Sequence, residues 1–331
     1  PRVLYAALDT INRTQLYLTT PSSKSGDALH QTQQLTFGPD NIWDFAVAPD
    51  DNVIYSILEG NGMSHLWTIR PGIDQVNLLV GCPDAVCNDA APSPSGRWVA
   101  YSRRKASTLA AGVLSPPRLW LLDGQSSQTS PVLNDEQRLG FLPRWSSDEQ
   151  WLSYVAPDLG GVGVHNVVTG EEHFYPTPAG EPGAWRPGHL QLVITTAQPL
   201  GERNALHLVL IDLATGGQQD LSGATSAVED GAPAWSPDGQ WLAFGRKVLT
   251  GAQATLGRQL WRMRADGSAA TALTADPSVD QGPPTWSPDG RYLLFTKLAL
   301  QDGASTVWLY DVQRDQQWVV ANAGQRPLWI P

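Results

Sequence analysis

Hydrophobic and polar residues alternate along the 331-residue chain in short stretches separated by turn residues. RYLLFTK (Arg291–Lys297) has the aromatic and aliphatic alternation typical of a strand, and SPDG (Ser287–Gly290) before it is typical of a tight turn. No stretch shows the 3.6-residue periodicity of an amphipathic helix. The pattern predicts an all-β protein.

The strands recur in a fixed order. PAWSPDGQWLAF (Pro233–Phe244) is nearly repeated as PTWSPDGRYLLF (Pro284–Phe295), and each copy is followed by a variable loop, an alternating strand, a polar turn and a more polar strand. Four short strands in a repeat of about 47 residues predict the blade of a β-propeller. Alignment on the proline of WSPDG or its equivalent places the copies at Pro49, Pro94, Ser147, Pro187, Pro237, Pro288 and Pro331.

The repeat length predicts a single propeller domain over residues 1–331 with seven four-stranded antiparallel blades; six or eight blades are the alternatives. One blade is predicted to be shared, because residues 1–37 match second, third and fourth strands and residues 326–331 match a first strand. This pairing of the C-terminal strand with the N-terminal blade would close the ring. The other blades are expected over residues 43–80, 90–133, 143–177, 183–222, 233–274 and 284–322.

Two long runs carry a resemblance to a known family. LTADPSVDQGPPTWSPDGRYLLFTK (Leu273–Lys297) and PAWSPDGQWLAFGR (Pro233–Arg246), the latter followed by QLWRMRADGSAATALT (Gln259–Thr274), resemble the repeat of TolB-type β-propellers. The resemblance is strong in the last two blades, fair around Pro49 and Pro94, and weak around Ser147 and Pro187. It implies the propeller architecture.

The fourteen tryptophans are numerous enough to suggest carbohydrate binding, but most of them recur at equivalent positions. Large flat side chains at repeated positions are expected to fill the space between blades. Trp43 and Trp318 fall outside this scheme, and Trp43, expected in a loop before a first strand, is the better candidate for a ligand contact. The recurring residues are Trp145, Trp185, Trp235, Trp286 and Trp329, then Trp98, Trp151 and Trp241, then Trp67, Trp120, Trp261 and Trp308.

The connections differ between the two predicted faces of the propeller. Those between strands 1 and 2 and between strands 3 and 4 are short, whereas the 2–3 and 4–1 connections vary and include the long loops Arg103–Pro117 and Arg246–Arg258. Binding surfaces tend to lie on variable loops above a rigid scaffold. We therefore call the face with the 2–3 and 4–1 connections the top face, and we expect function there.

The 4–1 loops, which lead to the predicted central channel, carry acidic residues in five repeats. Converging carboxylates would favour a cation or a basic peptide at the channel mouth, although Arg144 and Arg326 interrupt the set. The alternative is that these acids are solvated or form Asx turns. The candidate binding residues are Asp44, Asp89, Glu181, Asp230 and Asp280, together with Trp43.

Cys82 and Cys87 are separated by four residues that include a Pro and an Asp suited to a turn. We expect a disulfide that closes this loop, and hence an extracytoplasmic location, periplasmic or at the cell surface; a reduced pair is the alternative.

The chain begins at Pro1 without a Met, so we expect a processed or trimmed form whose anchor or export signal lay upstream.

Charge and motifs narrow the function classes. A net charge of -10 and a pI near 5.0 disfavour nucleic acid as a partner, and no apolar run is long enough to insert into a membrane. Nucleophile-elbow, zincin, P-loop and EF-hand motifs are absent. No cofactor or metal is expected, because the six histidines are not predicted to converge: His30, His65, His165, His173, His189 and His207.

These observations favour a non-catalytic binding scaffold that holds a protein partner through top-face loops, such as a subunit or tethered domain of an envelope or surface complex. The alternative is a propeller lyase or hydrolase that acts on a polysaccharide, with channel carboxylates as acid and base. That alternative requires two carboxylates within about 5–10 Å of each other at one pocket.

Overall fold

The computed structural model describes residues 2–21, 32–108, 110, 112–201 and 203–330, and within these ranges the chain forms strands and no helix. None of these residues therefore belongs to a helix that could cross a membrane. The contacts divide the chain into two compact units. Unit 1 comprises Pro1–Ala7, Tyr17–Gln34 and Thr177–Pro331, and unit 2 comprises Leu8–Leu16 and Leu35–Pro176.

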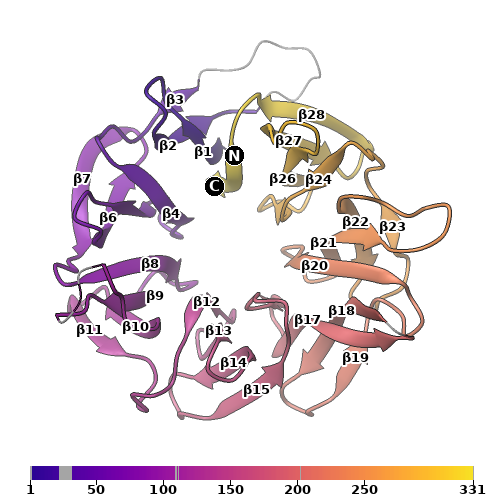
Figure 1. The fold of residues 1–331 in the computed structure, drawn as a ribbon, viewed down its shortest axis with the longest axis horizontal. Helices are drawn as coiled ribbons and strands as arrows, with labels where there is room; N and C mark the ends of the chain where they lie inside the picture. Colours follow the sequence, from indigo (N-terminus) through magenta and orange to yellow (C-terminus); the bar gives the residue numbers. More distant parts are fainter. Residues whose placement is uncertain (1, 22–31, 109, 111, 202, 331) are drawn as a thin grey trace. The chain divides into compact units, whose positions relative to one another are not determined.

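Unit 2 holds three groups of four consecutive strands, each an antiparallel meander in chain order (Figure 1). A parallel bridge between Ser64 and Val86 joins the first two groups into one sheet. The groups are β4 (Asn41–Val47), β5 (Val53–Leu58), β6 (Ser64–Arg70) and β7 (Ile73–Val80); β8 (Ala85–Pro92), β9 (Trp98–Lys105), β10 (Arg118–Asp123) and β11 (Gln128–Pro131); and β12 (Phe141–Trp145), β13 (Trp151–Ala156), β14 (Gly161–Asn166) and β15 (Glu172–Pro176).

Unit 1 contains three further groups with the same order, and the first strand of the last group is in two pieces interrupted at Pro283 and Pro284. The groups are β16 (Ala184–Trp185), β17 (Gln191–Leu200), β18 (Arg203–Asp212) and β19 (Gln218–Asp220); β20 (Val228–Trp235), β21 (Trp241–Val248), β22 (Gln259–Arg264) and β23 (Thr271–Ala272); and β24 (Val279–Gln281), β25 (Thr285–Trp286), β26 (Tyr292–Ala299), β27 (Ser305–Asp311) and β28 (Gln316–Ala321).

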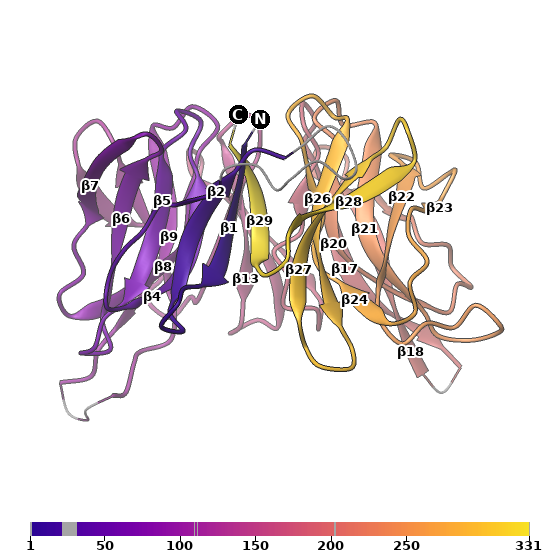
Figure 2. The same cartoon turned by 90° about the horizontal axis from the view of Figure 1, so that it is seen from above.

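The two ends of the chain share one sheet, as the repeat predicts. Its order is β29 (Gln325–Ile330), β1 (Arg2–Leu8), β2 (Thr14–Thr19) and β3 (Gln33–Gln34), and Figure 2 shows β29 beside β1. The antiparallel register places Val3 opposite Trp329 and Leu4 opposite Leu328. Val3, Leu4 and Ile330 are fully buried, so this pairing contributes to the core of unit 1. Pro331 lies outside the described residues.

The all-β class and the four-stranded propeller blade are confirmed; seven blades in one ring stay a prediction of the repeat. The first strands begin upstream of the predicted boundaries: β8 at Ala85, β20 at Val228 and β24 at Val279. The alternating pattern could not show this because register shifts interrupt β8 after Asn88 and β20 after Gly231. A β-bulge places two residues opposite one, which breaks the period of two.

The WSPDG sequence forms the turn between the first and second strands. The Ser236 hydroxyl accepts the Trp241 N–H at 2.9 Å and donates to the Asp238 carboxylate, a bond that holds the pKa of Asp238 below its ordinary value. Gly239 has a φ of 65°, which glycine adopts without strain, and its N–H closes the turn on the Ser236 carbonyl at 2.8 Å. The turn at Ser287–Tyr292 repeats these bonds.

In four of the WSPDG-like motifs, the opening tryptophan joins neighbouring blades. Its indole N–H donates to a main-chain carbonyl in or next to the first strand of the preceding blade. Three of these side chains are at most 8% exposed. The predicted packing role is therefore confirmed for these positions, and it includes a directional bond that the sequence pattern does not reveal. The bonds are Trp145 to Ala91 (2.9 Å), Trp235 to Ala184 (3.2 Å), Trp286 to Ala234 (3.0 Å) and Trp329 to Thr285 (3.1 Å).

Removal of residues 326–331 should lower the melting temperature by roughly 10 °C or more, because burial of Trp329 and Ile330 is lost and β1 gains an open edge. The matched variant Trp329→Phe keeps most of the burial and loses the indole bond, so its melting temperature should fall by about 2–4 °C. Calorimetry or circular dichroism measures both. An unchanged midpoint after the deletion would show that the pairing of the chain ends does not stabilise the fold.

Candidate binding residues at the first strands

The predicted acidic residues do not lie in free loops. Four of them belong to first strands: Asp44 to β4, Asp89 to β8, Asp230 to β20 and Asp280 to β24. Glu181 alone lies in the segment that precedes its first strand, β16. The loop assignment was wrong because each of these strands begins upstream of the point at which the repeat becomes recognisable. Trp43, also expected in a loop, lies in β4 and is 43% exposed.

The first strands share a bulge with unusual backbone geometry. Asp89, Leu142, Ala232 and Arg326 have φ values of 55°, 52°, 52° and 54°, and each lies five positions before the residue on which the repeats align. A positive φ is uncommon for residues other than glycine and costs roughly 1–3 kcal/mol. Its recurrence in both units shows that the bulge is a regular part of this repeat.

In unit 2, Asp89 holds the bulge of the next blade. Its carboxylate accepts a hydrogen bond from the Ser102 hydroxyl at 2.7 Å and another from the backbone N–H of Leu142. Burial, and then the charge of Asp44, raise the pKa of Asp89, while the Ser102 and Leu142 bonds and the Arg144 charge act in the opposite direction. The fold therefore brings Asp44, Asp89 and Arg144 close enough together to interact electrostatically.

Unit 1 repeats this arrangement with a glutamate. Oε2 of Glu181 accepts the bulge N–H of Ala232 at 3.0 Å and the Thr195 hydroxyl at 3.3 Å. A carboxylate that precedes or belongs to one first strand thus caps a backbone N–H in the next blade. Such charge-assisted bonds partly offset the cost of the bulge.

The other two acids of unit 1 have different partners. Asp230 is fully buried; it accepts bonds from Arg246 at 2.6 and 2.7 Å and from the Ser222 hydroxyl at 2.6 Å, which identifies a structural ion pair. Asp280 accepts the backbone N–H of Arg258 at 2.6 Å. The five acids are therefore divided between the units, and their convergence on one channel stays a prediction.

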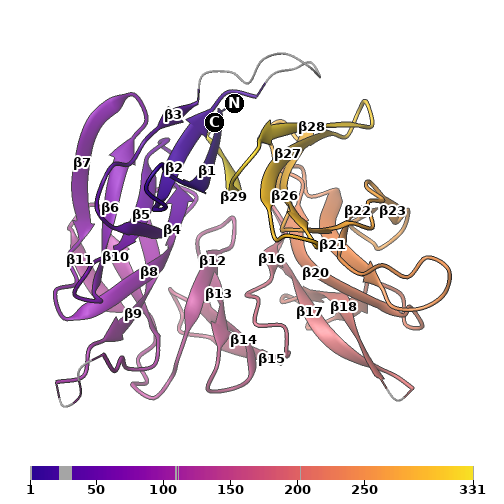
Figure 3. The same cartoon turned by 45° about the horizontal axis from the view of Figure 1, so that its top comes forward.

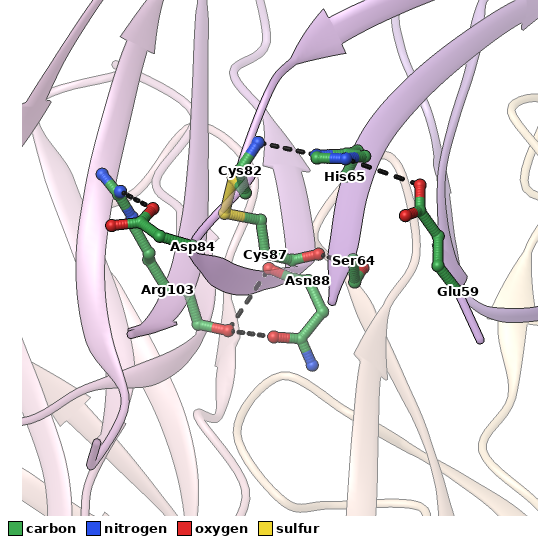
Figure 4. Close-up of a disulfide and its surroundings, with 9 residues drawn as sticks. Glu59, Ser64, His65, Cys82, Asp84, Cys87, Asn88 and Arg103 are labelled. Atoms are coloured by element: carbon green, nitrogen blue, oxygen red, sulfur yellow. Dashed lines mark hydrogen bonds and ion pairs between the residues drawn. A yellow bond between two sulfur atoms is a disulfide. The ribbon is translucent and has the colours of Figure 1, made fainter. Parts of the chain in front are cut away.

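The predicted disulfide between Cys82 and Cys87 is present, and both residues are at most 1% exposed (Figure 4). The backbone N–H of Cys82 donates to Nδ1 of His65 at 2.7 Å, and the Ser64 hydroxyl donates to the Cys87 carbonyl at 2.8 Å. These contacts fix the first residues of β8 to β6. They thereby support the segment that carries Asp89.

Three other histidines have local side-chain partners. His207 is 1% exposed, with Nδ1 2.9 Å from Asp220 and Nε2 2.8 Å from the Ser226 carbonyl. His165 and His173 each lie within 4 Å of a glutamate, and His30 is outside the described residues. Over the ranges that the structure describes, no three His, Cys, Asp or Glu side chains form a group that could hold a metal ion.

Two features of the first strands were not found in the sequence. Leu142 and Ala232 contribute through their backbone N–H groups, and apolar side chains give no hint of that role. Arg258 lies in a long 2–3 loop, and its guanidinium lies near Glu181 across Gly231. The only available signals were Gly231 and Gly245, each in a position of the strand pattern that favours a larger residue.

Comparison with known proteins establishes the fold. No protein-family model and no curated protein matches the sequence. Among solved structures, TolB from Acinetobacter baumannii aligns with all of this chain at a TM-score of 0.57 and 13% identity, and the chain spans 66% of its length. The oligogalacturonate lyase of Vibrio parahaemolyticus aligns with 97% of this chain at a TM-score of 0.66 and 10% identity, and the alignment covers 85% of the lyase.

A puromycin hydrolase aligns with 99% of this chain at a TM-score of 0.69 and 14% identity, and the chain spans 53% of its length. The β-propeller domain of the trilobed protease from Pyrococcus furiosus aligns with 86% of this chain at a TM-score of 0.64 and 13% identity. At these identities the similarity concerns the fold, since propellers serve many activities. The chain has a β-propeller fold, as the WSPDG repeats indicate, and it is similar in fold to TolB.

The double variant Cys82→Ala/Cys87→Ala should lower the free energy of unfolding by about 2 kcal/mol, because the disulfide restricts a short loop in the unfolded chain. Urea unfolding monitored by tryptophan fluorescence measures the change. The wild type unfolded in the presence of a reducing agent is the control and should match the variant. Equal urea midpoints for the variant and the oxidised wild type would contradict a stabilising role.

Asp89→Asn should make the protein more stable at pH 7 and leave its stability unchanged at pH values well below 3.8, the ordinary pKa of aspartate. Because burial raises the pKa of Asp89, the native state binds the proton more tightly than the unfolded state. The favourable contribution of the protonated acid is therefore lost as the pH rises through the raised pKa. Melting temperatures from pH 3 to pH 8 test this; a difference that does not change with pH would refute it.

Proposed function

We propose that the chain is a non-catalytic binding scaffold that holds a protein partner through its top-face loops. The observation that carries this proposal is the distribution of exposed apolar side chains. Of the fifteen large hydrophobic side chains that are exposed in the described part of the chain, eight lie at the end of a second strand or in the loop that follows it. They are Leu8, Ile11, Leu58, Val113, Leu159, Leu256, Leu298 and Leu300.

The connections of the opposite face, between strands 1 and 2 and between strands 3 and 4, carry few exposed large hydrophobic side chains. Among the described residues, the turns between first and second strands carry none. The turns between third and fourth strands carry Val168, and Ile73 begins β7 directly after one of them. Exposed apolar groups gathered on one set of loops are typical of a protein interface, whereas polar turns are typical of a solvated surface. Each unit has one long 2–3 loop with an exposed apolar side chain, Val113 (54% exposed) in unit 2 and Leu256 (79% exposed) in unit 1.

An extracytoplasmic location belongs to the same proposal. A buried disulfide persists in an oxidising compartment, and the pair of Cys82 and Cys87 supports a periplasmic or surface location. A role as a subunit or tethered domain of an envelope complex would agree with this location. The net charge of -10 argues against nucleic acid as the partner.

A lyase or hydrolase that acts on a polysaccharide is the second candidate, and the raised pKa of Asp89 beside Asp44 favours it. Both acids, however, have structural surroundings: Asp44 is 7% exposed, and Asp89 already accepts two hydrogen bonds. A fixed, capped carboxylate is less suited to proton transfer than a free one. We therefore favour the scaffold, with a cation or basic peptide near the first strands as an additional ligand.

Affinity capture from the native envelope tests the scaffold with matched variants. Leu256→Asp should reduce the recovery of the partner about tenfold, the effect of losing about 1.4 kcal/mol of binding free energy. Val168→Asp introduces the same charge at a site of similar exposure, 73% against 79%, and should leave recovery unchanged. Quantitative mass spectrometry compares the eluates. Equal recovery by the two variants would refute a top-face interface.

A further inference from the structure

Two glycines face each other in the β20–β21 pair, which Figure 3 shows in unit 1. Gly231 lies directly opposite Gly245, and both are buried beneath side chains from other segments. A Cβ atom at Gly245 would lie 3.1 Å from Cδ of Arg258. A Cβ atom at Gly231 would lie 3.6 Å from Oε1 of Glu181 and 3.8 Å from Nη2 of Arg258. Two opposite charges therefore flank one point above this glycine pair.

Other groups hold the Glu181 carboxylate and the backbone of Arg258 in place. Oε2 of Glu181 is bonded to Ala232 and Thr195. The backbone of Arg258 is fixed on both sides, because its N–H donates to Asp280 at 2.6 Å and its carbonyl accepts the N–H of Gln281 at 3.0 Å. The positions of the two charges thus do not depend on a bond between them.

The facing atoms have no partners within the described part of the chain. The Arg258 guanidinium makes no hydrogen bond or ion pair there, its Nε is buried without an acceptor, and Oε1 of Glu181 accepts no bond. The adjacent cross-strand pair, Asp230 and Arg246, forms a closed ion pair with two bonds. Successive pairs point to opposite faces of a sheet. One face therefore carries a completed ion pair, whereas the other carries the guanidinium of Arg258 and Oε1 of Glu181, neither of which has a bonded partner among the described residues.

The chemistry of the two groups defines a ligand. A guanidinium binds a carboxylate with two parallel N–H bonds, and a carboxylate oxygen binds an ammonium group strongly. Because both groups flank one point, the complementary charges of the ligand must be only a few ångströms apart. The terminus of a peptide supplies only one of these charges, whereas an α-amino acid carries both on one carbon.

We propose that Glu181 and Arg258 bind the zwitterionic head of a free α-amino acid over the Gly231–Gly245 pair. The ammonium group donates to Oε1 of Glu181, and the carboxylate accepts from the guanidinium of Arg258. Asp280, Ala232 and Thr195 are positioning residues. Arg258 ends the loop that carries Leu256, so separate measurements distinguish the two proposals. Amino-acid titration tests the Glu181–Arg258 site, whereas partner capture with Leu256→Asp tests the protein interface, and either can fail without the other.

Thermal-shift measurements on the full chain test the proposal with each of the twenty amino acids at up to about 10 mM, a concentration that reveals sites with a Kd near 1 mM. At least one amino acid should raise the melting temperature. Calorimetric titration with that amino acid, its N-acetyl derivative and its amide should show at least a tenfold loss of affinity for each derivative. No shift with any amino acid, or equal binding of the derivatives, would overturn the site.

Variants assign the binding to these residues. Arg258→Gln and Glu181→Gln should each abolish the titration signal, whereas Glu229→Gln, which alters a half-exposed ion pair on the same strand, should preserve it. Because Glu181 also caps the bulge, Gly231→Ala provides an independent test. Its new Cβ makes ordinary contacts of 3.6–3.8 Å and should leave the fold intact while it fills the space between the charges. Unchanged affinity in Gly231→Ala would refute the proposed position.

Discussion

A propeller blade cannot bury both of its faces alone, and the contact between one blade and the next is the constraint on which this structure depends. The indole of Trp235 or Trp286 makes that contact directional, because its N–H donates to a carbonyl of the preceding blade while its ring fills the space between them. Hydrophobic burial alone would permit neighbouring blades to slide. The hydrogen bond sets their register.

Carboxylates make a second contact of the same kind. Asp89 and Glu181 accept backbone N–H groups of the next blade at Leu142 and Ala232, where the chain has a positive φ. These two acids, which the sequence suggested as ligand-binding residues, therefore have a structural role. In such a repeat, conformational cost in one blade is offset by a charged side chain in its neighbour.

The sequence was informative wherever side chains repeat with a regular period. Strand order, the pairing of the chain ends, the tryptophan packing and the disulfide all follow from patterns of residue type. It was uninformative where backbone groups form the contacts. A bulge has no residue signature when Leu142 or Ala232 occupies it. The predicted first strands therefore began too late in the sequence, and their acids were assigned to loops. The pattern also does not reveal the Arg258–Glu181 arrangement, since these two residues belong to different repeats and meet only over the Gly231–Gly245 pair.

The pairing of β1 with β29 also has a consequence for the order of folding. β1 leaves the ribosome before the intervening strands, and β29 is synthesised only after them. Until then the N-terminal sheet has an unpaired edge, which is open to pairing with other chains. The native pairing of the two ends therefore cannot form until all the intervening strands have been synthesised.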